Sequence, residues 1–217
     1  MKVIVFLGPT LPVREARALL RADFRPPARQ GDVFAAIDDA PDVIVLIDGV
    51  FEAVPSVWHH ELLAAHAAGI QLFGACSMGA LRAAELPGVV RPLGEIARRF
   101  VDGRWNDDAH VALLHGDEAS GYRALSVPWV NVWATARAAR RVLGAREAQR
   151  LCEVADAMFY KARTWPRLFE ALGWSAELRA KVKPLIVDLK ADDARLALRF
   201  VARAKPPRRA ERDASFS

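Results

Sequence analysis

The first ninety residues alternate between short, mostly apolar runs and stretches with helical periodicity. The runs VIVFL (3–7), VIVLID (43–48) and IQLFGA (70–75) have the length of strands, and each is followed by a turn and a segment with apolar residues at helical spacing. Apolar strands separated by helices are typical of a parallel sheet that is covered on both faces. We therefore predict an α/β fold with a small, doubly wound, mainly parallel sheet.

Strand patterns fade after residue 90. Residues 91–103 predict a helix that ends at Gly103, and VALLH (111–115) predicts a short strand. Most of the remaining chain has the pattern of successive amphipathic helices, with Thr164, Ser175 and a residue near Asp192 as N-caps. The predicted organisation has three parts: an α/β core over 1–135, a helical annex over 136–204 and a basic, disordered tail over 205–217.

Composition narrows the class of protein. The 217 residues are 53% hydrophobic, enough for a sizeable core, and 31 Lys and Arg against 26 Asp and Glu give a formal charge of +5. Much of that excess lies in 205–212, so we expect no nucleic-acid partner. No apolar stretch approaches the roughly 20 residues of a membrane span, and MKVIVFLG predicts a first strand rather than a signal peptide. The expected location is the cytoplasm, without membrane contact.

Three turn-forming or polar segments follow the predicted strands. They are GPT, with Gly8, Pro9 and Thr10, then DGVF (48–51), and then GACSMG (74–79). Open parallel sheets bind ligands in the crevice outside the carboxyl ends of their strands. We therefore expect these three segments to border one site.

GACSMG has the pattern of a nucleophile elbow, a sharp turn from strand to helix that exposes a reactive side chain. Such a turn needs small residues two positions before and after the nucleophile. Ala75 and Gly79 meet this need for Ser77, whereas Cys76 has the larger Met78 on one side. The spacing favours Ser77 as nucleophile, with the amides of Met78 and Gly79 binding an oxyanion. The alternative is that the glycines serve close packing and Ser77 is a simple N-cap.

A nucleophilic serine needs a base, and the pair HH in SVWHHELL follows the strand that ends at Asp48. Adjacent helical residues point about 100° apart, so at most one of His59 and His60 can face the site. We take His59 as the candidate base, with a solvated helix histidine as the alternative. Asp48 either orients that histidine or caps its own loop, because a buried carboxylate needs partners. Arg82 is a candidate binding residue, or else the partner of Glu85 in a surface pair.

Two further patterns predict neither a metal nor a cofactor. Asp107 and Asp108 lie near His110 in WNDDAH, but adjacent acids usually cap helices or face water, so we predict no metal site. The sequence also has no glycine pattern for binding phosphates and no CxxC pair. We therefore expect no nucleotide or dinucleotide cofactor.

Six blocks of the sequence, in order and spacing, resemble the TfuA-like family: FLGPTLP, RPPARQGD, IDGVFEAVPSVWHHELL, FGACSMGALRAAEL, DGRWNDDAHVALLH and GYRALSVPWVN. They span about residues 5–135. Members of this family pair with YcaO enzymes, so the resemblance implies a role in making backbone thioamides in ribosomally made, modified peptides. It implies that the YcaO partner activates the amide with ATP, while the TfuA-like protein assists sulfur delivery and meets the precursor peptide indirectly.

The resemblance leaves two functions open. As a serine-type thioacid hydrolase without a cofactor of its own, the protein would release sulfide from a thiocarboxylated, ubiquitin-fold carrier, using Ser77, His59 and Asp48. As an adaptor, it would dock the tail of that carrier and recruit the YcaO enzyme through the helical annex. The family pattern has a small residue such as Ala where this chain has Cys76. That thiol is either an incidental filler or an acceptor of sulfur as a persulfide.

Overall fold

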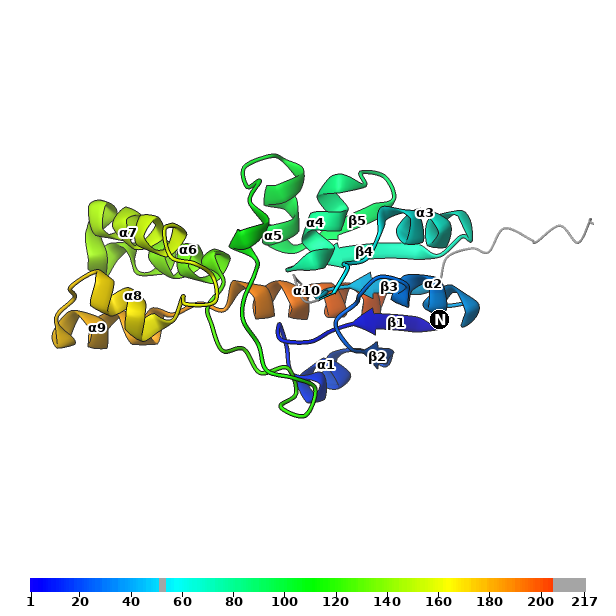
Figure 1. Cartoon of the computed structure of the whole chain (residues 1–217), viewed down its shortest axis with the longest axis horizontal. Coiled ribbons are helices and arrows are strands. Elements are labelled where there is room, and N and C mark those ends of the chain that lie inside the picture. The colour runs from blue at the N-terminus through cyan, green and yellow to red at the C-terminus, as the bar shows by residue number, and fades with distance from the viewer. Residues whose placement is uncertain (51–53, 205–217) are drawn as a thin grey trace, which may run out of the picture.

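The protein forms an α/β fold around one five-stranded sheet, seen in a computed structural model that describes residues 1–50 and 54–204 (Figure 1). All neighbouring strands are parallel, in the order β2-β1-β3-β4-β5. The strands are β1 (Val3–Phe6), β2 (Asp23–Arg25), β3 (Val43–Leu46), β4 (Gln71–Ala75) and β5 (Val90–Leu93). This is a common order of doubly wound sheets, in which the strand order reverses between β1 and β3. The predicted fold class is confirmed.

Helices cover both faces of the sheet. The helices on one face are α2 (Asp32–Asp38), α3 (His59–Ala67) and α4 (Met78–Glu85), and those on the other are α1 (Val13–Leu19) and α10 (Leu189–Arg203). Side chains alternate along a strand, so Ile4 of β1 faces the first group and Val5 faces the second. Both side chains are fully buried, which explains the continuous apolar runs in the sequence.

Several local predictions differ from the structure. The two outer strands, β2 and β5, were not predicted, because the edge segments DFR and VRPL are partly exposed and contain charged residues. Residues 111–115 form no strand, and His115 makes a single bridge to Ala124. α3 begins at His59, with Trp58 at the N-cap position in place of the predicted Ser56. The N-cap predicted near Asp192 is Asp188, whose side chain accepts from the Ala191 amide. The predicted N-caps Thr164 and Ser175 are confirmed, since both side chains accept hydrogen bonds from the backbone of their helices.

The second half of the chain is mostly helical. After β5 the chain continues into α5 (Gly94–Val101), α6 (Trp129–Ala138), α7 (Arg140–Asp156), α8 (Trp165–Ala171) and α9 (Ala176–Val182), with short 3-10 helices η1 (Asp108–His110) and η2 (Lys183–Leu185). α6 to α9 lie to one side of the sheet, whereas α10 runs along it (Figure 1). Ala194, Ala197 and Leu198 of α10 are buried against the strands. α10 therefore packs on the same face of the sheet as α1. The predicted division into a core over 1–135 and an annex over 136–204 stays a prediction.

Two more sequence-based expectations concern membrane-spanning helices and the C-terminal tail. Across 1–50 and 54–204, no helix combines the length and the apolar character needed to cross a membrane. The predicted basic tail over 205–217 lies outside the described residues.

Asp193 of α10 joins that helix to the first turn of α5. Its carboxylate accepts hydrogen bonds from the backbone amides of Glu95 at 2.9 Å and Ile96 at 2.7 Å. Burial raises the pKa of Asp193 from 3.8 to about 6, although the two hydrogen bonds act in the opposite direction. The ionised form of this group therefore costs the folded state some stability.

This shift predicts a pH dependence of unfolding. A folded-state pKa above the unfolded one makes a contribution to stability that is present below pH 3.8 and is lost as the pH rises through about 6. For this group alone, the free energy of unfolding should be about 1.4 kcal/mol higher at pH 5 than at pH 7. Urea titrations of the wild type and Asp193→Asn at both pH values isolate the contribution. An equal pH dependence in the two proteins would contradict it.

Candidate active site

A cleft of about 370 Å³ opens at the carboxyl ends of β1, β3 and β4. Its walls come from the loops after these strands, from two segments of the helical half and from α10. The lining residues are Pro9, Asp48, Gly49, Val50, Ser77, Leu113, Leu114, His115, Tyr160, Lys161 and Lys190. The cleft thus borders the point where the strand order reverses, the usual ligand site of such sheets. The loops after β1, β3 and β4 do meet at one site, as the sequence predicted.

Asp48 holds the loop that follows β1. Its buried carboxylate, 1% exposed, accepts hydrogen bonds from the amides of Gly8 at 2.9 Å and Thr10 at 3.0 Å. The Thr10 hydroxyl donates a third, at 2.5 Å. Asp48 was predicted to orient a histidine or to cap its own loop, but these three bonds bind it to the neighbouring loop instead. Gly8 and Thr10 are therefore positioning residues, and Pro9 between them lines the cleft.

Lys190, in the first turn of α10, lies beside Asp48 and is only 2% exposed. Its Nζ donates to the Val111 carbonyl at 3.0 Å and lies 4.0 Å from Asp48 Oδ1. Burial lowers the pKa of Lys190, while the charge of Asp48 acts to raise it. An ammonium has three donors, and 4.0 Å is too long for a hydrogen bond. Lys190 can therefore donate to a ligand in the cleft.

Lys190 was not predicted as a site residue, although the sequence contains a signal for it. Lys190, Ala194 and Ala197 recur at positions i, i+4 and i+7 of one helix, which places them on the same face. The two alanines are apolar residues of the buried stripe. A lysine in line with such a stripe needs a buried partner, which is Asp48 in the folded chain.

The turn between β4 and α4 is strained at Cys76. The Ser77 amide donates to the Ala75 carbonyl at 2.9 Å, and Cys76 between them has a φ of 65°. A three-residue turn with positive φ is rare for a residue other than glycine, and such strain gathers at functional sites. The elbow pattern placed the strained position at Ser77, so the structure shifts it by one residue. Ser77 itself is 4% exposed, makes no capping hydrogen bond and lines the cleft.

Cys76 is fully buried on the α10 side of the sheet. Burial raises the pKa of the Cys76 thiol, and the charges of Asp193 and Asp48 raise it further. Because the thiolate is the nucleophilic form, this environment is unfavourable for sulfur chemistry at Cys76. It supports the interpretation of Cys76 as a small filler.

Gly74 and Gly79 allow β4 and α4 to approach closely. A Cβ on Gly79 would lie 1.8 Å from the Leu46 carbonyl oxygen, and one on Gly74 would lie 2.1 Å from the Gly79 oxygen. The Gly79 amide donates to the Ile47 carbonyl at 3.3 Å, so it is not free to bind an oxyanion as predicted. The Met78 amide, at the first position of α4, remains a candidate donor.

His59 and Arg82 form a surface cluster with Glu85 that lies apart from the cleft residues. His59 Nε2 is 2.8 Å from Glu85 Oε2, and its side chain is 47% exposed. Arg82 forms an ion pair with Glu85 and donates from Nε to the Val57 carbonyl at 2.9 Å. Neither residue lines the cleft. The predicted assignment of His59 as base and Arg82 as binding residue therefore disagrees with their placement.

His115 is the histidine that lines the cleft. Its Nδ1 lies 2.6 Å from the Gly116 carbonyl oxygen, which can only accept, so the proton of the neutral ring is on Nδ1. Nε2 is then left with a lone pair, as a general base requires. The edge-on ring of Tyr122, 5.9 Å away, packs beside the imidazole. His115 was missed as a candidate because it lies in a loop far from the sheet in sequence.

Comparison with known proteins identifies the family of the chain. A family model described as "TfuA-like protein" matches residues 48–164, just over half of the chain. The matched range includes Asp48, the 74–79 turn and His115. No curated protein matches the sequence. The chain belongs to the TfuA-like family.

Proposed function

We propose that this protein hydrolyses the C-terminal thiocarboxylate of a ubiquitin-fold sulfur carrier and delivers the released sulfide to a YcaO enzyme that forms peptide thioamides. The observation that carries the proposal is the gathering of Ser77, His115 and Lys190 around one cleft at the ends of three parallel strands. Membership of the TfuA-like family supports the association with a YcaO partner. ATP, where it is needed, would be bound by that partner.

In the proposed reaction, Ser77 Oγ attacks the thioacid carbonyl while His115 Nε2 accepts its proton. Lys190 and the Met78 amide stabilise the negative charge of the tetrahedral intermediate. The C–S bond then breaks, and the sulfur leaves as hydrosulfide, taking up the proton from His115. Water, deprotonated by His115, hydrolyses the acyl ester on Ser77 and returns the carrier with an ordinary carboxylate. The ammonium of Lys190 also neutralises the thiocarboxylate, which would otherwise repel a nucleophile.

The shape of the site supports a polypeptide substrate. A second cleft of about 370 Å³ adjoins the first and shares Pro9, Leu113 and Lys190 with it. Together the two hollows form a path on both sides of Lys190. A flexible, extended carrier tail can follow such a path and place its terminal acid group against the ammonium.

A non-catalytic adaptor is the second candidate function, and one observation favours it. Among the described residues, the Ser77 hydroxyl makes no hydrogen bond to an imidazole. The cleft would then only dock the carrier tail, while the helical half recruits the YcaO enzyme. Catalytic hydrogen bonds are often completed only when the substrate is bound, so the hydrolase is kept as the first proposal.

A pair of histidine variants tests the proposed hydrolase. His115→Gln should slow sulfide release from a purified thiocarboxylated carrier by at least about 100-fold, because it removes the general base. His59→Gln is the matched control and should stay within about 2-fold of the wild type, since His59 lies in the surface cluster. Mass spectrometry of the carrier follows the change from thiocarboxylate to carboxylate. Equal losses, or a loss only in His59→Gln, would reject this assignment of the base.

A further inference from the structure

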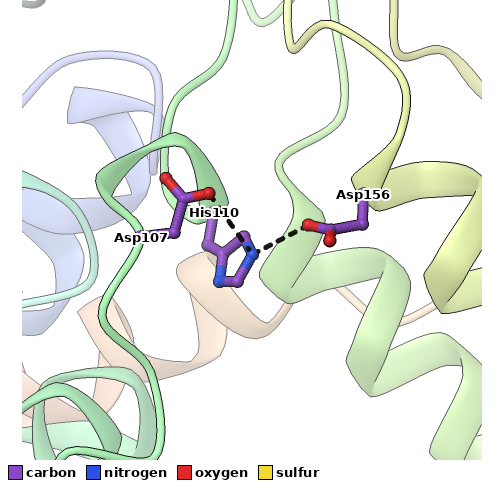
Figure 2. Close-up of side chains that lie close together, drawn as sticks. All are labelled: Asp107, His110 and Asp156. Atoms are coloured by element: carbon purple, nitrogen blue, oxygen red, sulfur yellow. Dashed lines mark hydrogen bonds and ion pairs between the residues drawn. The ribbon is translucent and has the colours of Figure 1, made fainter.

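A second group of chemically active side chains lies outside the cleft. Asp107, His110 and Asp156 point toward one another, from the start of η1 and the end of α7 (Figure 2). His110 Nε2 is 2.9 Å from Asp156 Oδ1 and 3.9 Å from Asp107 Oδ2. One ligand atom from each residue lies within 4.8 Å of the other two. The sequence placed two of these residues together, and the fold adds the third from 46 positions away.

These separations suit a shared metal ion. Bonds of 2.0–2.2 Å to imidazole nitrogen and carboxylate oxygen place neighbouring ligands roughly 3 to 3.5 Å apart. The separation of His110 and Asp156, 2.9 Å, is close to that range and is also that of a hydrogen bond. The separation of Asp107 and His110, 3.9 Å, exceeds it, so the exposed Asp107 side chain has to move closer to share an ion.

The three side chains are held in place by their surroundings. The His110 ring stacks on Trp129, with centroids 4.1 Å apart and planes inclined by 18°. Its Nε2 faces the two carboxylates, whereas Nδ1 is buried without a partner among the described residues and would carry the ring proton when Nε2 binds an ion. Asp107 Oδ1 accepts from the Ala109 amide at 2.8 Å, which leaves Oδ2 for the cluster. The arrangement is thus set before an ion arrives.

The local charge also favours a cation. Asp156 is the last residue of α7, where the helix dipole disfavours a carboxylate. Arg163 caps this helix end, donating to the carbonyls of Ala155 at 2.8 Å and Met158 at 3.2 Å. The charges of Asp156 and Asp107 act to raise the pKa of this buried guanidinium, but burial lowers it overall. One guanidinium against two carboxylates leaves negative charge in excess.

We propose that Asp107, His110 and Asp156 form a binding site for a divalent first-row metal ion of the zinc type. Imidazole with two carboxylates is a mixed nitrogen and oxygen set that such ions accept. The side chains of Asp107 and Asp156 are 50% and 58% exposed, so an ion can enter from solvent and complete its shell with water. This proposal does not depend on the hydrolase function.

Such an ion would join two segments that lead into the active-site cleft. His110 precedes Leu113, Leu114 and His115 by a few residues, and Asp156 precedes Tyr160 and Lys161 in the same way. Both segments form cleft walls. A metal ion bound there would link the loop carrying His115 to the end of α7 and stabilise the shape of the cleft.

Metal binding to the tag-free full chain tests the site. After treatment with a chelator, calorimetric titration with Zn²⁺ should give one bound ion per wild-type chain. Asp107→Asn and Asp156→Asn should each weaken this affinity at least 10-fold, since each removes a ligand. Asp108→Asn is the matched control, because it makes the same charge change one residue away, and it should keep the wild-type affinity within about 2-fold.

Thermal unfolding provides a second readout. Without metal, the variants should melt cooperatively, which shows that they are folded. At one Zn²⁺ concentration, the unfolding midpoint of the wild type and of Asp108→Asn should rise clearly more than that of Asp156→Asn, because tighter binding to the folded state stabilises it more. The site is rejected if the wild type binds no Zn²⁺ at millimolar concentration, or if all three variants bind it as the wild type does.

Discussion

Replacing Ser77 by alanine is expected to abolish sulfide release from a thiocarboxylated carrier, with a loss of at least about 1,000-fold in rate. The hydroxyl is the proposed nucleophile, so its removal eliminates the acyl-enzyme route, while the Met78 amide and Lys190 can still bind the tail. The side chain makes no capping hydrogen bond, so the folded structure should be retained. Mass spectrometry of the carrier measures the rate, and circular dichroism verifies the fold.

Cys76→Ala makes the Ser77 experiment specific. Cys76 is adjacent to Ser77 but buried, and alanine keeps a small side chain at this position. If Cys76 is only a filler, this variant should release sulfide within a few-fold of the wild-type rate. A loss confined to Cys76→Ala would instead indicate that the Cys76 thiol is the nucleophile, forming a thioester with the carrier while hydrosulfide leaves.

The Ser77→Ala variant also distinguishes the hydrolase function from the adaptor function. In a reconstituted mixture with a YcaO enzyme, its precursor peptide and the thiocarboxylated carrier, a hydrolase lacking Ser77 should fail to support thioamide formation. An adaptor would support it without the hydroxyl. Normal thioamidation by Ser77→Ala, together with unchanged binding of the carrier, would therefore overturn the hydrolase proposal and leave the docking function.

Replacing Gly79 by alanine should destabilise the whole fold, by on the order of 4 kcal/mol or more. The added Cβ would lie 1.8 Å from the Leu46 carbonyl oxygen and 3.1 Å from the Gly74 Cα, and both are backbone atoms that no rotamer change can move. Relief requires α4 to move away from β3 and β4. That movement breaks the hydrogen bond from the Gly79 amide to Ile47 and opens the core. A domain of ordinary stability loses much of its margin in this way.

Gly103→Ala is the control for Gly79→Ala. Gly103 has a φ of 73°, and a Cβ there would have no neighbour within 4 Å. This substitution should cost only about 1 kcal/mol, from the positive φ alone. Urea unfolding of both variants measures the difference. Similar free energies of unfolding for the two would show that close packing at Gly79 is not the determining factor.

The central strands and the loops after them could be predicted because their signals are local. A strand buried on both faces requires a continuous apolar run, and VIVF and VIVL meet this requirement without reference to the rest of the chain. β2 and β5 were missed because an edge strand is covered less completely and tolerates charged residues such as Asp23 and Arg91. Their pairing becomes apparent only once the inner strands are in place.

The candidate site, like the sheet, has a part that could be predicted from the sequence and a part that could not. Asp48 and Ser77 each follow a strand, and the carboxyl ends of neighbouring parallel strands always share one edge of the sheet. The role of a residue in the turn is harder to predict from the sequence, because it depends on atoms from other helices and strands. The Gly79 amide donates to the Ile47 carbonyl, just after β3, and is therefore not available to an oxyanion. Spacing within the turn cannot reveal this contact.

The sequence by itself determined the parallel sheet, the covering helices and the edge of the sheet where the reactive loops meet, since these follow from apolar periodicity and strand direction. Only the tertiary structure decided which distant residues complete the sites. His115 and Lys190 reach the cleft, and Asp156 reaches His110, because the chain leaves the sheet after β5 and returns with α10. Local patterns specify that a segment is helical or apolar, but the surface on which it packs is set by the burial available in the whole fold.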